Sequence, residues 1–245
     1  MRLFEQEAAG VYRLRVPFED LTTSVFLLET AKGPVLYDCA TTSEDVEQVI
    51  LPALAEMGVA PEKLRALVLS HAHADHSGGE AALRQHAPQI SVITAHTTAD
   101  GDMLFDGWQA LHLPGHALDC LGLYDQSTGV LLTGDALQLR GIGRFGCGLA
   151  APNAYLQTIE KVRTLAPQVI LTAHTYAPHG DRAEGAAERA RYLDGCADAA
   201  REIAAFVAAH RQRTAEEIAA AFRAQHADWP LLPKSTVKNI LKENA

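Results

Sequence analysis

Residues 64–79 hold the feature that most restricts how this chain can fold, because a short apolar run, LRALVLS, leads directly into HAHADHSGG. A continuous apolar run of this length is typical of a strand buried on both faces of a sheet. Four side chains of metal-ligand type follow within six residues: His71, His73, Asp75 and His76. Alternating imidazoles and carboxylates in one turn can face two neighbouring cations. We therefore predict a metal site at the end of a buried strand, the alternative being a solvated histidine-rich loop.

Three more polar side chains lie at the ends of apolar runs later in the chain. His116 ends the motif LPGH, Asp135 ends TGD, and His174 follows QVILTA. Because α/β folds collect their sites where strands end, we expect these three side chains to join the first four. His179 competes with His174 for the last position. We favour His174, since it directly follows a predicted strand, whereas His179 lies beyond Pro178 in a predicted loop.

The rest of the chain alternates between predicted strands and helices. Residues 11–16, 23–30 and 33–38 have the composition of strands, and the last two can pair as a hairpin. Residues 43–58 carry apolar side chains at helical spacing and end at a glycine, which predicts an amphipathic helix. Further strands are expected at residues 90–95, 110–114, 120–125, 129–135 and 168–174, and further helices at 80–87 and 153–166.

The C-terminal part changes to an alanine-rich composition at about residue 184. One helix is expected up to residue 210, a second begins at the T-x-x-E capping box of Thr214 and Glu217, and a third begins near Ser235. We therefore predict a catalytic domain of residues 1–190 and a helical appendage of residues 191–245. Its apolar positions are expected to pack internally, over the pocket or in a homodimer contact: Ile203, Phe206, Val207, Ile218 and Phe222. Three others are candidates for a wall of the substrate cavity: Trp229, Leu231 and Leu232.

Composition limits the classes of function. An apolar share of 48% over 245 residues is ample for a core, and a formal charge of −9 argues against a nucleic-acid or anionic-membrane surface. The four cysteines are far apart and form no C-x-x-C pair, which favours reduced thiols over a zinc ribbon or a disulfide framework. The first residues lack the apolar stretch of a signal peptide, and no run reaches membrane-spanning length. We expect a cytoplasmic protein with a small-molecule substrate and no nucleic-acid or membrane partner.

The order of the motifs, H-x-H-x-D-H, then PGH, then GD, then a late histidine, resembles the metallo-β-lactamase superfamily over about residues 10–180. The resemblance implies an α+β fold, the αββα sandwich of two mixed β-sheets flanked by helices, with the C-terminal helices added to it. It also implies two divalent metal ions, for which zinc suits the ligands best and iron or manganese are alternatives. One ion would be held by His71, His73 and His116, the other by Asp75, His76 and His174, and Asp135 would bridge both.

The same resemblance implies a metal-dependent hydrolase. We expect a bridging hydroxide to attack an ester-type carbonyl, most simply that of a thioester or ester of a small acyl compound. Asp75 and Asp135 are the expected catalytic residues, with Asp75 or a metal-bound water helping to protonate the leaving group. Asp38 matches an aspartate that the family commonly has near the site, where it would orient a ligand, although a turn-forming aspartate is the plain alternative.

One subfamily invites a comparison. GDALQLRGIGRFGCG is similar to the corresponding stretch of the hydroxyacylglutathione hydrolases (glyoxalase II), in which G-x-G-[KR] follows the bridging aspartate, and residues 174–176 match their H-x-Y. The resemblance implies that Arg144 and Tyr176 contact the thiol-bearing part of a thioester, and His179 is a further candidate for the pocket lining. The C-terminal helices lack the basic glutathione-binding sequence expected of that family, which argues against glutathione itself.

Five alternatives stay open. The lactonases typically have a tyrosine at the place of Gln138, and a β-lactamase-like amide hydrolase would need an export signal, so both are disfavoured. A mononuclear iron sulfur dioxygenase, or a diiron reductase, would use the same ligands. A ligand-sensing regulator would use the C-terminal helices, which faintly resemble a winged helix. From residue 196 onward the chain has seven Lys or Arg against six Asp or Glu, which is poor support for DNA binding.

Overall fold

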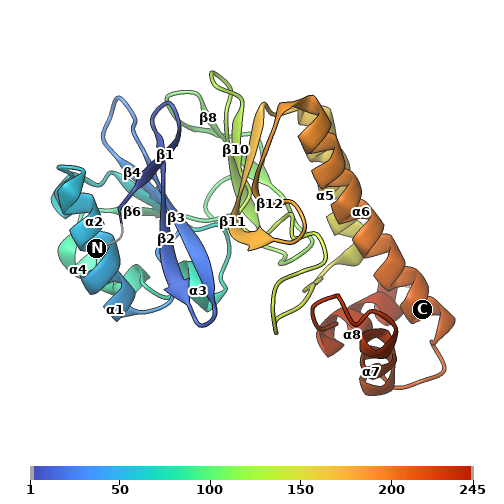
Figure 1. The fold of residues 1–245 in the computed structure, drawn as a ribbon. Coiled ribbons are helices and arrows are strands. Elements are labelled where there is room, and N and C mark those ends of the chain that lie inside the picture. Colours follow the sequence, from blue (N-terminus) through green and yellow to red (C-terminus); the bar gives the residue numbers. More distant parts are fainter. Residues whose placement is uncertain (1–2, 244–245) are drawn as a thin grey trace. The chain divides into compact units, whose positions relative to one another are not determined.

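The computed structural model describes residues 3–243, which form two compact units. The first unit holds the residues up to 112 together with 121–130, and the second holds 113–120 together with the residues from 131 onward. Within residues 3–243 the strands form two sheets of six, in the orders β1-β2-β3-β4-β5-β6 and β12-β11-β10-β9-β8-β7, with helices flanking them (Figure 1). The predicted fold class, two β-sheets flanked by helices, is confirmed.

The first sheet lies wholly in the first unit. Its strands β1 to β4 pair antiparallel, whereas β4, β5 and β6 pair parallel, so the sheet is mixed. The predicted hairpin is confirmed, since Leu28 faces Val35 across β3 and β4. The first strand was not predicted, because its four residues, EQEA, are mostly polar. The strands are β1 (Glu5–Ala8), β2 (Val11–Phe18), β3 (Leu21–Leu28), β4 (Val35–Tyr37), β5 (Ala66–Val68) and β6 (Ser91–Ile93).

The predicted helix at 43–58 exists as three consecutive segments. Thr42 caps it one residue before the predicted start, and its capping box uses Asp45. The helical segments of the first unit are α1 (Ser43–Asp45), η1 (Val46–Ile50), α2 (Leu51–Glu56), η2 (Pro61–Lys63), α3 (Ala74–Ser77) and α4 (Glu80–His86). Their apolar faces join the strands in one core, whose buried members include Leu14, Val16, Val46, Ile50, Leu54 and Leu83.

The second sheet contains two strands that the sequence did not predict, β7 and β12. β12 pairs antiparallel with β11, and Tyr176 faces Gly180 beside the turn that joins the two strands. Because of this pairing, β11 continues beyond His174 to Tyr176. His174 therefore lies within the strand, whereas the sequence predicted that it would directly follow the strand. The strands are β7 (Met103–Phe105), β8 (Trp108–His112), β9 (Leu121–Asp125), β10 (Val130–Leu132), β11 (Val169–Tyr176) and β12 (Gly180–Glu184).

The helices of the second unit agree with the predicted ones. They are α5 (Pro152–Leu165), α6 (Gly185–Ala209), α7 (Ala215–Gln225) and α8 (Lys234–Glu243). The capping box of Thr214 and Glu217 is confirmed, and the apolar positions that we expected to pack are buried. The long helix α6 packs beside α5 and on β12, and α7 and α8 lie at its C-terminal end (Figure 1). It runs unbroken through residue 190, and the division into residues 1–190 and 191–245 stays a prediction.

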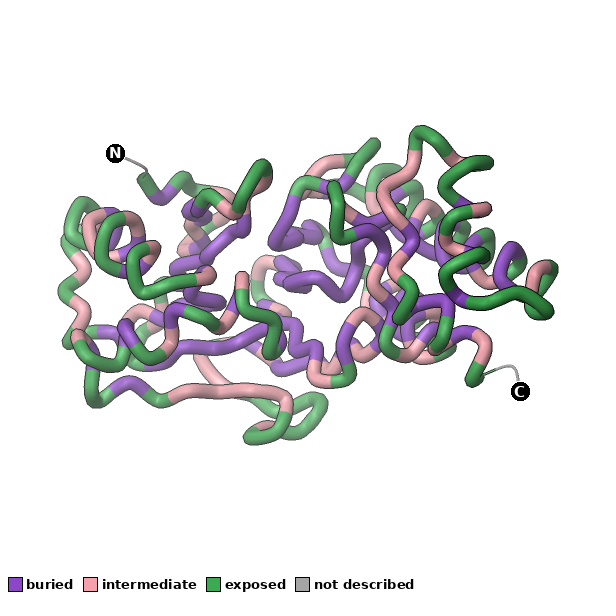
Figure 2. The backbone as a smooth tube through the Cα atoms, turned by 90° about the horizontal axis from the view of Figure 1, so that it is seen from below, coloured by how far each residue is buried: buried purple, intermediate pink, exposed green. Residues whose placement is uncertain are grey.

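Burial is greatest in inner strands of each sheet such as β3, β4, β10 and β11, whereas the edge strands β1, β6, β7 and β12 are mostly half-buried or exposed. Figure 2 shows the buried stretches of the chain in purple and the exposed ones in green. All four cysteines are buried and unbridged. Among residues 3–243, no helix has both the length and the apolar character needed to cross a membrane.

Removal of residues 196–245 should abolish folding of the second unit. The cut leaves the first turns of α6 but removes the buried side chains of Ile203 and Val207, each of which is at most 1% exposed. We expect the truncated chain to lose its near-UV circular dichroism and its cooperative thermal transition. As a control, Arg201→Ala on an exposed position of α6 should change the stability by no more than about 0.5 kcal/mol. A truncated chain with native spectra would contradict this account.

Candidate metal centre

The histidine-rich loop of the first unit begins where β5 ends. Since β4 and β5 are parallel, the residues that follow them meet at the same edge of the sheet. The Asp38 N–H donates to the Val68 carbonyl at 2.8 Å, and the Ser70 N–H donates to Asp38 Oδ1 at 2.7 Å. Asp38, which directly follows β4, thus anchors the start of the loop.

Asp38 also holds one of the expected ligands. Its carboxylate is fully buried, and Oδ2 accepts the Ser70 hydroxyl and lies 2.8 Å from His76 Nδ1. A proton on Nδ1 makes this contact a hydrogen bond and leaves the lone pair of the ring on Nε2, the nitrogen that can bind a cation. His76 Nε2 lies 3.4 Å from the Asp75 carboxylate. Asp38 therefore orients His76, the role that the family resemblance implied for it.

His71 and His73 lie against each other in the same loop. Nε2 of the buried His71 is 2.9 Å from Nδ1 of the exposed His73, and His71 Nδ1 is 3.0 Å from the Ser70 hydroxyl. Two ring nitrogens thus converge, one from each imidazole. Convergent neutral imidazole nitrogens are the donor set that zinc and similar divalent ions accept.

In the second unit, Asp135 and His174 are brought together by β10 and β11. The Thr133 N–H donates to the Leu171 carbonyl and the Ala173 N–H donates to the Gly134 carbonyl, both at 3.1 Å. This alignment places Asp135 Oδ1 3.5 Å from His174 Nε2. Both side chains are buried, so that their desolvation calls for a compensating charge or hydrogen bond.

Tyr176 supplies one such hydrogen bond. Its hydroxyl donates to Asp135 Oδ1 at 2.9 Å. Burial, and next the charge of Asp135, raise the pKa of Tyr176 well above its ordinary value, so that the phenol keeps its proton. Tyr176 therefore fixes the carboxylate, and its expected contact with a substrate stays a prediction.

His116 is placed by the LPGH motif. Gly115 has φ +149°, and a Cβ there would lie 2.5 Å from the Tyr155 Cα, so no larger residue fits. His116 Nε2 lies 3.8 Å from Asp135 Oδ2, and Nδ1 lies 3.0 Å from the Gly148 carbonyl. The ring thus presents Nε2 toward Asp135 and its other nitrogen to a backbone acceptor.

Gln138 binds the backbone that faces His116. Its Nε2 donates to the Gly148 carbonyl at 2.6 Å, and its Oε1 accepts the Gly148 N–H at 3.2 Å. A Cβ at Gly148 would lie 3.3 Å from the His116 ring, closer than most such contacts. The sequence indicated Gln138 only as the place of a lactonase tyrosine. In the structure its amide binds Gly148, and the amide nitrogen also lies 3.0 Å from His116 Nδ1.

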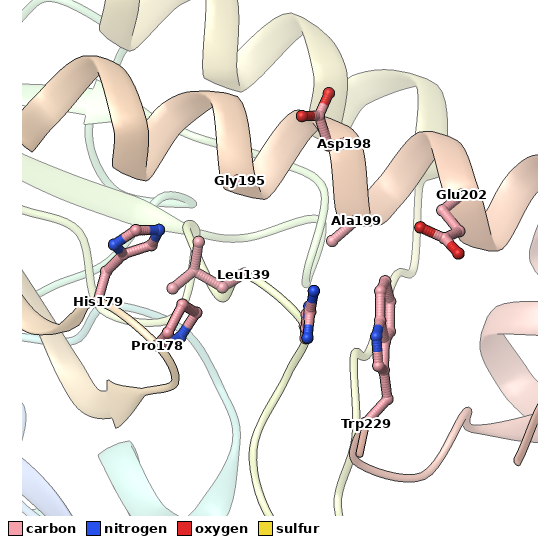
Figure 3. Close-up of a pocket in the computed structure, with 9 residues that line it drawn as sticks. Leu139, Pro178, His179, Gly195, Asp198, Ala199, Glu202 and Trp229 are labelled. Carbon is pink, nitrogen blue, oxygen red and sulfur yellow. The ribbon is translucent and has the colours of Figure 1, made fainter. Parts of the chain in front are cut away.

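A small cavity of about 180 Å³ also lies in the second unit (Figure 3). Its lining includes Leu139, Pro178, His179, Asp198, Glu202 and Trp229. The Arg140 guanidinium lies 4.6 Å from the centre of the Trp229 ring. His179 and Trp229 thus line a pocket. Of the other described candidates, Arg144, Leu231 and Leu232 lie outside this lining, and the Arg144 guanidinium extends over the Phe145 ring at 5.3 Å.

Each unit brings its own predicted ligands together. The first groups His71, His73, Asp75 and His76, and the second groups His116, Asp135 and His174. Sequence reasoning missed the supporting groups Ser70, Gln138 and Gly148. Ser70 could have been found, because it directly precedes His71. The contact between Gln138 and Gly148 depends on a loop conformation that no spacing rule predicts.

Comparison with known proteins identifies the family to which these motifs correspond. The sequence profile described as the Metallo-beta-lactamase superfamily matches residues 19–99 and 87–174. These ranges include every expected metal ligand and cover more than half of the chain.

Curated relatives are hydroxyacylglutathione hydrolases. The one from Idiomarina loihiensis is 33% identical over 128 residues, which are 47% of this chain and 49% of the relative. The one from Yersinia enterocolitica is 33% identical over 138 residues, which are 51% of this chain and 53% of the relative. The chain thus spans about half the length of the curated relatives it matches.

Solved structures share the fold. A metallo-beta-lactamase family protein of Thermus thermophilus has a TM-score of 0.69 at 18% identity, with 96% of this chain and 92% of that chain covered. A flavo di-iron protein of Thermotoga maritima has a TM-score of 0.65 at 15% identity, with 84% and 62% covered. At these identities the likeness supports the fold and leaves the activity open.

Removal of the Asp38 carboxylate should destabilise the first unit. Asp38→Ala leaves the buried Ser70 N–H and His76 Nδ1 without this acceptor, which should cost about 2 kcal/mol. The free energy of unfolding in urea measures the loss. Asp106→Ala, which removes a carboxylate from an exposed loop contact with Ala31, is the matched control and should have a small effect. Equal stabilities of the two variants would contradict the anchoring role of Asp38.

Proposed function

The chain belongs to the metallo-beta-lactamase superfamily, and we propose that it is a metal-dependent hydrolase that cleaves a thioester or ester of a small acyl compound. The observation that carries the proposal is the arrangement of ligands within each unit. Convergent imidazole and carboxylate groups stand at the ends of strands, and the remaining ring nitrogens of His76 and His116 face a carboxylate and a backbone carbonyl. Hydrogen bonding of this kind is usual for histidines that bind metals.

We assign the seven ligands to two divalent ions. The first ion would be held by His71, His73 and His116, the second by Asp75, His76 and His174, and Asp135 would contact both. The donor set fits such ions, because neutral imidazoles and carboxylates suit zinc first, then iron or manganese. None of these ligands is a thiolate, and all four cysteines of the chain are buried free thiols.

Bound divalent ions of this kind lower the pKa of a coordinated water and polarise a substrate carbonyl. The chain supplies the remaining work. Tyr176 holds Asp135 in one orientation through its 2.9 Å hydrogen bond. Asp75 is half-buried rather than sealed, so we assign to it the transfer of a proton to the leaving group.

The relatives and the pocket support the proposed substrate class. Relatives named hydroxyacylglutathione hydrolase favour a thioester, and the match covers about half of their length. The cavity of the second unit is lined by two carboxylates, those of Asp198 and Glu202, against one guanidinium, that of Arg140, and this excess of negative charge disfavours an anionic group such as those of glutathione. We therefore propose a small acyl thioester that carries no such carboxylates, contacted by Arg144, Tyr176 and His179.

The central test is Asp135→Ala. We expect the hydrolysis of small thioesters to fall to background and the metal content of the purified protein to fall with it, because the variant removes the carboxylate that both ions would share. Metal content is measured by mass spectrometry, and turnover with a panel of thioesters, lactones and a β-lactam. Asp194→Asn, which changes an exposed carboxylate paired with Arg163 in the same unit, is the control and should retain both properties.

The outcomes separate the alternatives. About two zinc equivalents together with thioester or ester turnover in the wild type support the proposal. One iron per chain and no hydrolysis would contradict the proposed hydrolase and favour the mononuclear iron sulfur dioxygenase. A folded Asp135→Ala variant with unaltered activity would refute the assignment of Asp135.

The substrate contacts have a test of their own. Arg144 and His179 are exposed, and neither is assigned to a metal. We expect Arg144→Ala and His179→Ala each to raise KM for the best thioester about tenfold, since about 1.4 kcal/mol of binding corresponds to that factor, with little change in kcat. Arg211→Ala, in the exposed turn after α6, is the control. A KM that stays at the wild-type value in both variants would remove these two residues from the binding site.

A further inference from the structure

The first turn of α8 binds the backbone on both sides of Gly148. The hydroxyl of Thr236 donates to the Cys147 carbonyl and accepts the Leu149 N–H, both at 2.9 Å. A hydroxyl can donate once while it accepts, so the two bonds are compatible. Thr236 is fully buried, and Asn239, one turn later, donates to the Leu149 carbonyl at 2.8 Å. All of these residues belong to the second unit.

The opposite side of the same backbone faces His116. The Gly148 carbonyl lies 3.0 Å from His116 Nδ1 and accepts a second hydrogen bond from Gln138, which its two lone pairs allow. The Gln138 amide nitrogen itself lies 3.0 Å from the same Nδ1. His116 Nδ1 therefore faces one acceptor, the Gly148 carbonyl, and one donor, the Gln138 amide, so the tautomer depends on how well the carbonyl is aimed at the ring. The contact with His116 is a hydrogen bond only when the imidazole carries its proton on Nδ1. In that tautomer Nε2, which points toward Asp135 at 3.8 Å, keeps its lone pair.

We propose that Thr236 is a positioning residue for His116. Its two hydrogen bonds hold the peptide groups before and after Gly148, so that the Gly148 carbonyl stays aimed at Nδ1 and selects the tautomer whose Nε2 binds a metal. The inference rests on the proposed function for the statement that His116 is a ligand. The selection of the tautomer does not depend on it. By this inference, α8 supports the metal centre, which is a role beyond packing.

Gln138 alone does not account for the aim of this carbonyl. Its side chain binds the N–H and the carbonyl of Gly148 itself, whereas the neighbouring peptide groups, at Cys147 and Leu149, are bound by Thr236. Rotation of a peptide plane moves the carbonyl and the next N–H together, so the bond from the Leu149 N–H to Thr236 constrains the Gly148 carbonyl directly. The peptide group between Gly148 and Leu149 thus connects Thr236 of α8, through its N–H, to His116, through its carbonyl.

The experiment compares Thr236→Val with Thr236→Ser. Valine keeps the shape of the side chain and loses both hydrogen bonds, whereas serine keeps the hydroxyl. Nitrogen-15 NMR of the imidazoles in metal-free protein reports the His116 tautomer, and competition of Zn²⁺ with a chelator reports the affinity. We expect the wild type and Thr236→Ser to carry the proton on Nδ1. Thr236→Val should show mixed tautomers and bind Zn²⁺ about 10-fold to 100-fold more weakly.

Asn239→Ala is the matched control, because it removes a hydrogen bond from the same helix to the same loop without freeing the peptide group between Gly148 and Leu149. It should leave the tautomer unchanged. A folded Thr236→Val variant with wild-type His116 shifts and wild-type Zn²⁺ affinity would reduce Thr236 to a packing role and overturn the proposal. A wild-type His116 with its proton on Nε2 in metal-free protein would overturn it even if Thr236→Val failed to fold. A wild type that binds no Zn²⁺, nor iron or manganese, would refute the proposed function instead, and the tautomer would still decide the role of Thr236.

Discussion

An imidazole ring has two nitrogens, and a neutral ring that binds a cation through one of them must carry its proton on the other. In each unit, other residues of the same unit provide the hydrogen-bond acceptors for this proton. In the first unit, the Asp38 carboxylate accepts from His76, and the Ser70 hydroxyl lies beside His71. In the second, the Gly148 carbonyl faces His116. Much of the local structure around these strand ends serves to keep those partners in place.

The partners are themselves held by hydrogen bonds that leave little freedom. Asp38 accepts hydrogen bonds from the backbone N–H and the hydroxyl of Ser70, and these bonds fix the orientation of the carboxylate toward His76. Gly148 is bound through Gln138 on one side, and its neighbours are bound through Thr236 on the other. Buried hydrogen-bond networks of this kind are costly to leave incomplete, so they favour one arrangement over many. Preorganised ligands in turn lower the cost of ordering the site when an ion binds.

The C-terminal helices belong to the core of the second unit. Helix α6 buries its apolar stripe against α5 and β12, and α8 sends Thr236 into the loop that faces His116. Their composition was informative about helices and their caps, since alanine content and the T-x-x-E box are local signals. It carried no information on the partner of Thr236, because that contact joins positions 87 and 89 residues apart in the chain.

The sequence alone was sufficient to predict the local features of this protein. The H-x-H-x-D-H, LPGH and TGD motifs predicted the ligand types and the strand ends, and the 3.6-residue apolar period predicted the helices. Each of these patterns depends on residues close together in the chain. Short polar strands such as β1 and β12 were not predicted, because their pairing with a neighbouring strand, and not their composition, makes them strands. Only the tertiary structure decided that His174 lies inside β11, that Tyr176 donates to Asp135, and that Gln138 and Thr236 bind around Gly148. These contacts depend on loop conformations and strand registers that are set by packing over long separations, and no local period encodes them.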